Sequence, residues 1–330
     1  MRNLLTDVAG VRVGHADDTR LASGLTAVVF DAPATASIAI HGGAPGVRDT
    51  ALLEPEMTVE AVDALVLSGG SAFGLDGMGG AMAALAEKGR GFAVGTTRVP
   101  IVPGAVLFDL NNGGNKAWGR QPPYWDFGYA AVEAAALDFA LGSVGAGFGA
   151  TTADLKGGLG SSSAHLASGY AIGALAAVNA LGQATIGDGP QFWAAPYERD
   201  GEFGGLGLPV FDRSGAPPFR TKGTAPQNTT ICIVVTDAIL TKAQCKRLAV
   251  VAQGGLALAL RPAHAALDGD VVFAAATGMN PRPVTTRDLT EIGALAAETL
   301  ARAIARGVFE ATALPFPNAL PSWRSRFGGP

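Results

Sequence analysis

The sequence predicts a single large α/β domain with a sizeable apolar core. Apolar residues make up 48% of the 330 residues and charged residues only 16%, while strand-like runs alternate with helix-like segments. This composition excludes general disorder, and the length fits one large domain. Glycine is abundant, at 46 residues without a collagen-like period, so we expect many tight turns and close backbone approaches.

Several short strands and one helix are predicted in the first third of the chain. The strands are expected over 11–16, 24–30, 37–41 and 64–68, between Gly-rich turns. The last of them leads into a Gly-rich loop, and a helix of small residues is expected over 75–88. Because glycine lowers helix stability, that helix must pack closely against a neighbouring element.

The middle of the chain is predicted to contain a capped helix, a buried strand and a long loop. Asp126 is expected to cap a helix that runs to Leu141. A run of small apolar residues over 169–178 is expected to form a buried strand that ends at Asn179. Residues 187–227 are polar and rich in Gly and Pro, which indicates an exposed loop or linker.

The last third carries the sharpest signals. A buried strand is expected over 230–236, and a capping box over 241–244 opens a helix. One apolar face of that helix is formed by Cys245, Leu248, Ala249, Ala252 and Leu256. A further strand is expected over 268–274, and a final helix through 292–303 is expected to stop at Gly307.

The charge pattern argues against nucleic acid and membrane partners. Net charge is −4, and the Lys and Arg residues are scattered. No run of 18 apolar residues occurs and the first residues lack a signal-peptide core, so we expect a soluble, cytoplasmic protein. Cys232 lies in a strand-like run and Cys245 on a helix face, which predicts two buried thiols rather than a disulfide.

Several familiar motifs are absent. The run Gly69-Gly70-Ser71-Ala72-Phe73 lacks the second glycine of a G-x-S-x-G nucleophile elbow. It also lacks the glycine spacing of a dinucleotide site, and the chain contains no phosphate-binding G-x-x-x-x-G-K-[ST] motif. The G-x-G-x-G run over 145–149 is not followed by a helix pattern. These motifs therefore assign no cofactor.

Histidine is scarce, which limits the available catalytic bases. The four histidines are His15, His41, His165 and His264. None is spaced from another as metal ligands are, so we predict no metal, and His264 is expected at the surface. A hydrolase without histidine needs another base. A free α-amino group, with a pKa of about 7.7–8.0, is partly neutral near pH 7 and shares its residue with a Thr, Ser or Cys nucleophile.

Such an amine must be created by cutting the chain, and residues 226–231 have a suitable layout. There a polar loop runs directly into a buried strand. At this point the sequence resembles the P1 family of peptidases, which includes aminopeptidase/D-amino-acid esterase-amidases, β-aminopeptidases and nylon-oligomer hydrolases. The resemblance spans nearly the whole chain. Its ordered blocks are residues 5–15, 46–50, 67–75, 102–110, 178–182, 228–230 and 268–270.

The resemblance implies a fold, a processing step and an assembly. It implies a four-layer α-β-β-α sandwich related to the N-terminal-nucleophile hydrolases. It also implies that one catalytic domain, residues 1–330, is cut between Asn228 and Thr229 into chains of residues 1–228 and 229–330. Family members form homo-oligomers, so a tetramer of processed heterodimers is expected.

Thr229 is the expected nucleophile. Its hydroxyl would attack the Asn228 carbonyl, form an ester by an N→O shift and, after hydrolysis, leave a free amine as base. From the residues alone, Thr229 reads as a threonine that starts a strand. Thr230 is the fallback nucleophile, although its side chain should point to the opposite sheet face.

Two further residues take roles from the resemblance. The Asn179 amide would stabilise the oxyanion; alternatively, Asn179 forms a turn before Ala-Leu-Gly. In the branch with a threonine nucleophile, a lysine at Lys156 would lower the pKa of the amine by like-charge repulsion or hold substrate. The alternative for Lys156 is a solvated loop lysine.

The remaining site candidates are two carboxylates, an aromatic ring and a loop serine. Asp268 and Asp270 would face one side of an extended chain and orient Thr229, or else form a polar turn. The branch with a threonine nucleophile carries this Asp-Gly-Asp. Phe108 stands where some relatives carry an active-site tyrosine and would line the substrate pocket or the core. Ser71 lies in a loop expected to shape the site, by packing or turn formation rather than by chemistry.

We therefore predict an autoprocessed amide hydrolase that forms an acyl-enzyme on Thr229. Its expected substrates are small peptides, amino-acid amides or ω-amino-acid oligomers of the 6-aminohexanoate type. One alternative is an acyltransferase of the ornithine acetyltransferase type, which would pass the acyl group to an amine. The other is an uncleaved small-molecule-binding protein that uses the Gly-rich loops.

Overall fold

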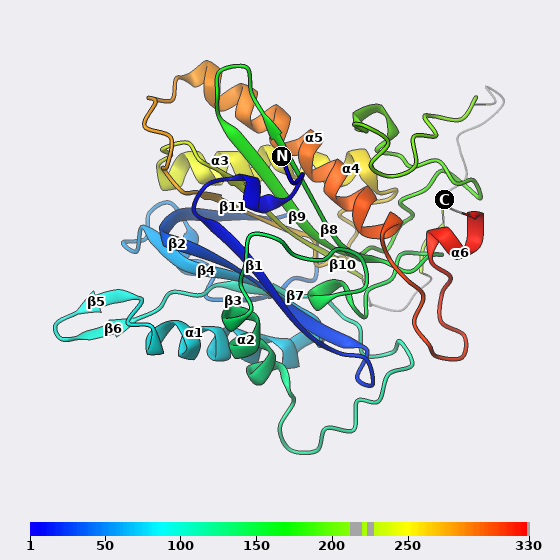
Figure 1. Ribbon diagram of the computed structural model, residues 1–330, viewed down its shortest axis with the longest axis horizontal. Coiled ribbons are helices and arrows are strands. Elements are labelled where there is room, and N and C mark those ends of the chain that lie inside the picture. Colours follow the sequence, from blue (N-terminus) through cyan, green and yellow to red (C-terminus); the bar gives the residue numbers. More distant parts are fainter. Residues whose placement is uncertain (212–219, 223–227, 329–330) are drawn as a thin grey trace.

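A mixed β-sheet lies at the centre of the computed structural model, which describes residues 1–211, 220–222 and 228–328. Within these residues its strands are β1 (Val11–Asp18), β2 (Ser23–Ile40), β3 (Gly46–Arg48), β4 (Ala61–Ser68), β7 (Gly104–Val106), β8 (Gly158–His165), β9 (Ala171–Asn179), β10 (Thr229–Thr236) and β11 (Val271–Ala276). Their order is β3-β7-β4-β2-β11-β10-β9-β8, and β1 pairs with β2. A separate hairpin, β5 (Phe92–Val94) and β6 (Thr97–Val99), projects from one end (Figure 1).

Helices cover the two outer faces of the β-structure (Figure 1). They are α1 (Gly77–Glu87) and α2 (Tyr124–Glu133) on one side, and α3 (Lys242–Ala252), α4 (Gly254–Ala259) and α5 (Thr286–Phe309) on the other. A short helix α6 (Trp323–Phe327) lies near the C-terminus, and a 3-10 helix over Ser71–Asp76 precedes α1.

Three apolar cores separate four layers. One lies between α1, α2 and the strands β2 and β4, and another between α3 to α5 and the strands β9 to β11. The strand β2 is 18 residues long and belongs to both halves of the sheet. The third core lies between these two halves. The pairing of β2 with β4 shifts register between Val29 and Ala34. The predicted four-layer α-β-β-α architecture is confirmed.

The two-residue period of β10 decides which side chains face which core. Ile231, Ile233 and Val235 pack in the core between the sheet halves, whereas Cys232 and Val234 pack under the helices. By the same period, Thr229 shares the inner face with Ile231, and Thr230 shares the helix side with Cys232. Both cysteines are free and buried, as predicted.

Several element boundaries differ from those expected. The two strands predicted over 24–30 and 37–41 form the single strand β2. Helix α2 ends at Glu133 rather than at Leu141, since the following backbone leaves the helix to pair with β1 through Ala136. Asp126 makes no cap, because it lies inside the first turn after Pro123.

One further expectation was wrong and another holds only in part, both for reasons of packing. Helix α5 continues through Gly307, where a Cβ atom would lie 2.9 Å from the backbone nitrogen of Gly160. The glycine therefore permits close helix–strand contact rather than ending the helix. The region 187–227 is not simply exposed: Phe192 and Phe203 are buried in the helix-side core. Parts of that region, 212–219 and 223–227, lie outside the described residues.

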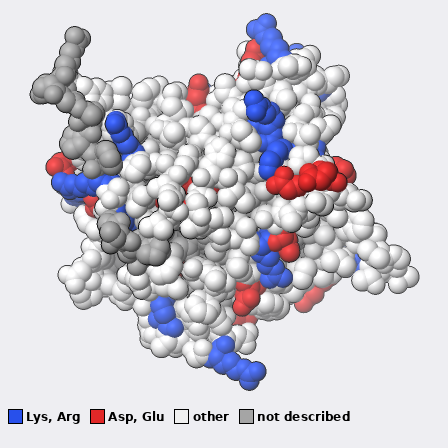
Figure 2. Space-filling view, turned by 180° about the vertical axis from the view of Figure 1, so that it is seen from behind, with Lys and Arg blue, Asp and Glu red and all other residues white. Residues whose placement is uncertain are grey.

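The structure of the last third of the chain largely matches the prediction from its sequence. The capping box of Thr241 and Gln244 is present, and its helix buries the predicted apolar face, although it breaks at Gln253 between α3 and α4. Charged side chains lie singly or in mixed pairs on the face drawn in Figure 2. In the described part of the chain, the helices are too short or too polar to cross a membrane.

Candidate active site

The ends of three neighbouring strands bring the candidate residues together. In the antiparallel pairing of β9 with β10, Thr229 lies opposite Asn179. Asn228 forms a parallel bridge with Asp268, just before β11. Since Asn179 shares the face of Ala177, its side chain and that of Thr229 both belong to the inner face of the sandwich. The site therefore lies at the open edge of the central core.

Thr229 lies directly beside the carbonyl that it would attack. Its hydroxyl donates a hydrogen bond to the backbone oxygen of Asn228. The backbone N–H of Gly269 donates to the same oxygen at 3.1 Å. A Cβ atom on Gly269 would lie 2.6 Å from the Thr229 Oγ1, so a side chain there would displace the hydroxyl. This arrangement aligns a hydroxyl with a carbonyl that a second donor already polarises.

The two carboxylates brace the chain around Thr229. Asp270 Oδ1 accepts the Thr230 N–H at 2.8 Å, and its Oδ2 accepts the His264 N–H at 2.9 Å. Asp268 Oδ2 accepts the Ala265 N–H at 2.8 Å. Burial, together with the charge of Asp270, raises the pKa of Asp268 to about 6. Asp270 thus holds the backbone of the residue after Thr229.

His264 was expected at the surface, and it is only partly exposed there. Its side chain is 23% exposed, and its Nδ1 lies 3.2 Å from Asp270 Oδ2. Burial lowers the pKa of His264, but the adjacent Asp270 carboxylate outweighs it and raises the pKa. The His264 ring also lies 5.4 Å from that of His41. No spacing in the sequence signals these contacts, since they depend on tertiary folding.

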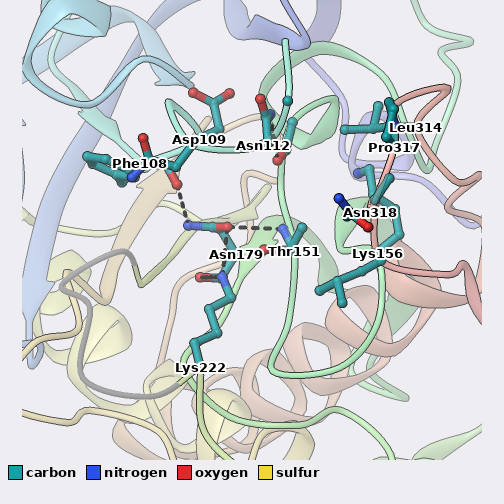
Figure 3. Close-up of a pocket in the computed structure, with 15 residues that line it drawn as sticks. Phe108, Asp109, Asn112, Thr151, Lys156, Asn179, Lys222, Leu314, Pro317 and Asn318 are labelled. Carbon is teal, nitrogen blue, oxygen red and sulfur yellow. Dashed lines mark hydrogen bonds between the residues drawn. The ribbon is translucent and has the colours of Figure 1, made fainter.

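Asn179 is held on both sides of its amide (Figure 3). Its Oδ1 accepts hydrogen bonds from the Thr151 N–H and from Lys222 Nζ, each at 3.0 Å. Its Nδ2 donates to the Phe108 carbonyl at 3.0 Å. The orientation of the NH₂ group is therefore fixed by three segments that are distant in the chain.

Lys156 is buried rather than solvated. It is 1% exposed, and its Nζ donates to the carbonyls of Gly147 at 3.0 Å and Gly157 at 2.7 Å. Burial lowers its pKa to about 7, an effect that the charge of Asp109 partly offsets. The solvated-loop alternative for Lys156 is therefore wrong.

Lys222 is a site residue that the sequence analysis missed. It lies in the region read as a linker, and only its contact with Asn179 reveals its position. Burial lowers its pKa to about 7; Asp268 opposes this shift and Lys156 adds to it. A lone lysine between Gly- and Pro-rich runs gives no sequence signal of such a position.

Phe108 lines two cavities. The larger, about 330 Å³, is lined by residues that include Lys156, Asn179 and Lys222. The smaller, about 250 Å³, is lined by Thr229 together with Ser71. Phe108 contributes to both walls, and Ser71 takes a positive φ of 51° where its loop turns beside Thr229. Ser71 therefore shapes the cavity, as its loop position suggested.

Among the described residues, no cluster of three or more His, Cys, Asp or Glu side chains has the arrangement of a metal site. The groups gathered here are instead a hydroxyl, an amide, two carboxylates and two amines. Together they offer a nucleophile beside a carbonyl, hydrogen-bond donors for an oxyanion, and titratable groups whose pKa values lie near neutrality.

Comparison with known proteins agrees with this chemistry. A model of peptidase family S58 matches residues 3–319. An uncharacterized aminopeptidase of Mycobacterium tuberculosis is 43% identical over 99% of this chain and 98% of that protein. A 6-aminohexanoate-oligomer endohydrolase of Paenarthrobacter ureafaciens is 26% identical over 89% of this chain and 82% of that protein.

A solved structure shares the fold. The L-aminopeptidase D-Ala-esterase/amidase of Ochrobactrum anthropi, described as a variant of the N-terminal-nucleophile hydrolase fold, superposes with a TM-score of 0.70 at 21% identity. The match covers 98% of this chain and 92% of that one. The predicted resemblance to self-processing aminopeptidases is confirmed, and the binding-protein alternative is set aside. The chain belongs to peptidase family S58 and is an aminopeptidase-type hydrolase with the N-terminal-nucleophile fold.

Proposed function

We propose that the chain cuts itself between Asn228 and Thr229 and that the new N-terminal threonine is the nucleophile. The observation that carries this proposal is the contact of the Thr229 hydroxyl with the Asn228 carbonyl, to which Gly269 also donates. Attack by Oγ1 forms a C–O bond, and the C–N bond then breaks as the nitrogen takes up a proton. Water hydrolyses the resulting ester to an Asn228 carboxylate and a free Thr229 amine.

The same atoms then act on substrate. The Thr229 amine takes the proton of its own hydroxyl as Oγ1 attacks the substrate carbonyl, and the departing amine takes up that proton. Water hydrolyses the acyl-enzyme, which releases the acid and restores the threonine. Asn179 Nδ2 supplies an oxyanion donor, since Thr151 and Lys222 already hold its oxygen.

The buried charges set the ionisation of this machinery. In their protonated form, Lys156 and Lys222 place positive charge near the site, which favours the neutral, basic form of the amine. Asp270 fixes the start of β10 through the Thr230 N–H, and Asp268 offers a carboxylate to the ammonium form. The proximity of these groups to the start of β10 supports these roles.

The substrates that we propose are small peptides, amino-acid amides or 6-aminohexanoate-type oligomers. Cavities of about 330 and 250 Å³ suit short chains rather than folded proteins. We propose that the processed chains, residues 1–228 and 229–330, remain together and assemble as a tetramer of heterodimers. Light scattering of the purified enzyme measures that assembly.

The test is the intact mass of the protein under denaturing conditions, with N-terminal sequencing of any small fragment. We expect a 102-residue fragment that begins Thr-Thr-Ile-Cys. Thr229→Val should remain one inactive chain. Thr230→Val is the matched control and should still cleave, because the buried Thr230 hydroxyl makes no hydrogen bond to the described residues. An uncleaved Thr229→Val protein with full activity would refute the proposal.

The assay also separates hydrolysis from acyl transfer. We expect turnover of a simple amide in buffer without an added amine acceptor, with the free acid as product. Turnover that requires an acceptor amine would support the acyltransferase alternative instead.

A further inference from the structure

The larger cavity is lined by two lysines that, among the described residues, donate hydrogen bonds to neutral oxygens only. Lys156 Nζ donates to the Gly147 and Gly157 carbonyls. Lys222 Nζ donates to Asn179 Oδ1 at 3.0 Å and to the Asn179 carbonyl at 3.3 Å. Within the described part of the chain, no salt bridge joins either lysine to a carboxylate, in contrast to lysines such as Lys88 and Lys246.

The acidic residue on the cavity wall is already engaged. Asp109 is 3% exposed, and its oxygens accept the Ser23 hydroxyl at 2.6 Å and the Gly70 N–H at 2.8 Å. The Asp109 charge raises the pKa of Lys156 by a long-range electrostatic interaction, without a hydrogen bond or ion pair between the two side chains. Keeping two ammonium groups at one cavity without a bound carboxylate is costly, as the lowered pKa of each lysine reflects.

The smaller cavity is lined mainly by apolar and uncharged residues. Apolar side chains such as Leu75, Val106 and Leu267 line it beside Thr229, and none of its lining residues is acidic. A positively charged substrate group would find no carboxylate among these lining residues. An anionic group in the larger cavity would find two lysines as counter-ions.

We propose that the larger cavity binds a free carboxylate of the substrate, with Lys222 and Lys156 as its cationic partners. The preferred substrates are then short amides that carry an apolar segment, placed beside Thr229, and a carboxylate within reach of the larger cavity. This inference rests on the proposed function and narrows its substrate class. Charge-assisted hydrogen bonds to a carboxylate replace the neutral contacts that the lysines now make.

The experiment uses the processed enzyme and two matched substrate pairs. One pair is the 6-aminohexanoate dimer and its C-terminal carboxamide; the other is glutaryl p-nitroanilide and the analogue with a carboxamide in place of its carboxylate. The pairs place the carboxylate on opposite sides of the scissile bond. We expect kcat/KM to favour the carboxylate about tenfold to a hundredfold in at least one pair. Lys222→Met should bring that ratio close to one, and Lys222→Arg should retain a preference.

The matched control is Lys88→Met, which removes an exposed lysine that pairs with Glu133, and it should leave the ratio unchanged. If Lys222→Met does not fold, inhibition of the unmodified enzyme by hexanoate and by hexanamide gives the same comparison. An equal kcat/KM, or equal inhibition, for the carboxylate and the carboxamide would overturn the inference. If the enzyme has nevertheless formed its Thr229 fragment, the proposed function stands. An uncleaved chain without hydrolytic activity would overturn both the inference and the proposed function.

Discussion

The strands β9, β10 and β11 carry different kinds of side chain in their middle and at one end. In their middle, β9, β10 and β11 carry only small and apolar side chains, packed between the sheet halves and under the helices. At one end they gather Asn179, Thr229, Asp268 and Asp270, all buried. Apolar packing fills the middle of the strands, whereas their end holds buried carboxylates, an amide and a hydroxyl that packing does not require.

The largest expected effect comes from placing a side chain where the site has room for none. Gly269→Ala should abolish self-cleavage, because its Cβ atom would lie 2.6 Å from the Thr229 Oγ1. Gly254→Ala is the control, since its nearest new contact is a Cβ atom at 3.9 Å in a helix. Denaturing gels after expression measure the cleavage. Normal processing of Gly269→Ala would mean that the hydroxyl is not confined as described.

The next effect concerns Asn179, which we propose as the oxyanion donor. Asn179→Asp keeps the oxygen that accepts from Thr151 and Lys222 but loses the NH₂ group. We expect kcat to fall about 10²–10³-fold. The melting temperature should also fall, because the new carboxylate oxygen faces the Phe108 carbonyl that the NH₂ group contacted. Steady-state kinetics on the processed variant give the result. A rate within a few-fold of the parent would exclude Asn179 from transition-state stabilisation.

A smaller effect is expected from the buried Lys156 charge. Its pKa is about 7 in the folded protein and about 10.4 when unfolded, so unfolding takes up a proton between these values. Stability should therefore rise with pH from about 7 to about 10. In the uncleaved Thr229→Val background, Lys156→Met should be roughly a few kcal/mol more stable at pH 7, with the difference vanishing near pH 10. Urea unfolding across this range measures it, and a pH-independent difference would contradict it.

The smallest effect is expected in the middle of a strand, away from the candidate site. Ile233→Val removes one methylene from the central core, far along β10 from the site. We expect a loss of about 0.5–1.5 kcal/mol in unfolding free energy and an unchanged kcat. A large change in kcat with normal stability would show that the middle of the strand also contributes to catalysis.

The sequence predicted the strands better than it predicted their ends. The run over 230–236 forms a strand because β-branched residues fill it, and the capping box at Thr241 works as local chemistry requires. By contrast, the end of α2 depends on β1, and the passage of α5 through Gly307 depends on β8. Neither partner is near in sequence, so no local pattern could indicate them.

The sequence by itself determined the α/β class, the apolar strands and the family blocks that pointed to Thr229, Asn179, Lys156, Asp268 and Asp270. Only the tertiary structure decided that Lys222 lies on Asn179, that His264 lies on Asp270, and that Gly269 donates to the Asn228 carbonyl. The physical reason is the same in each case. Local propensity and side-chain period act over a few residues, whereas these contacts join segments that only the closed sandwich brings together.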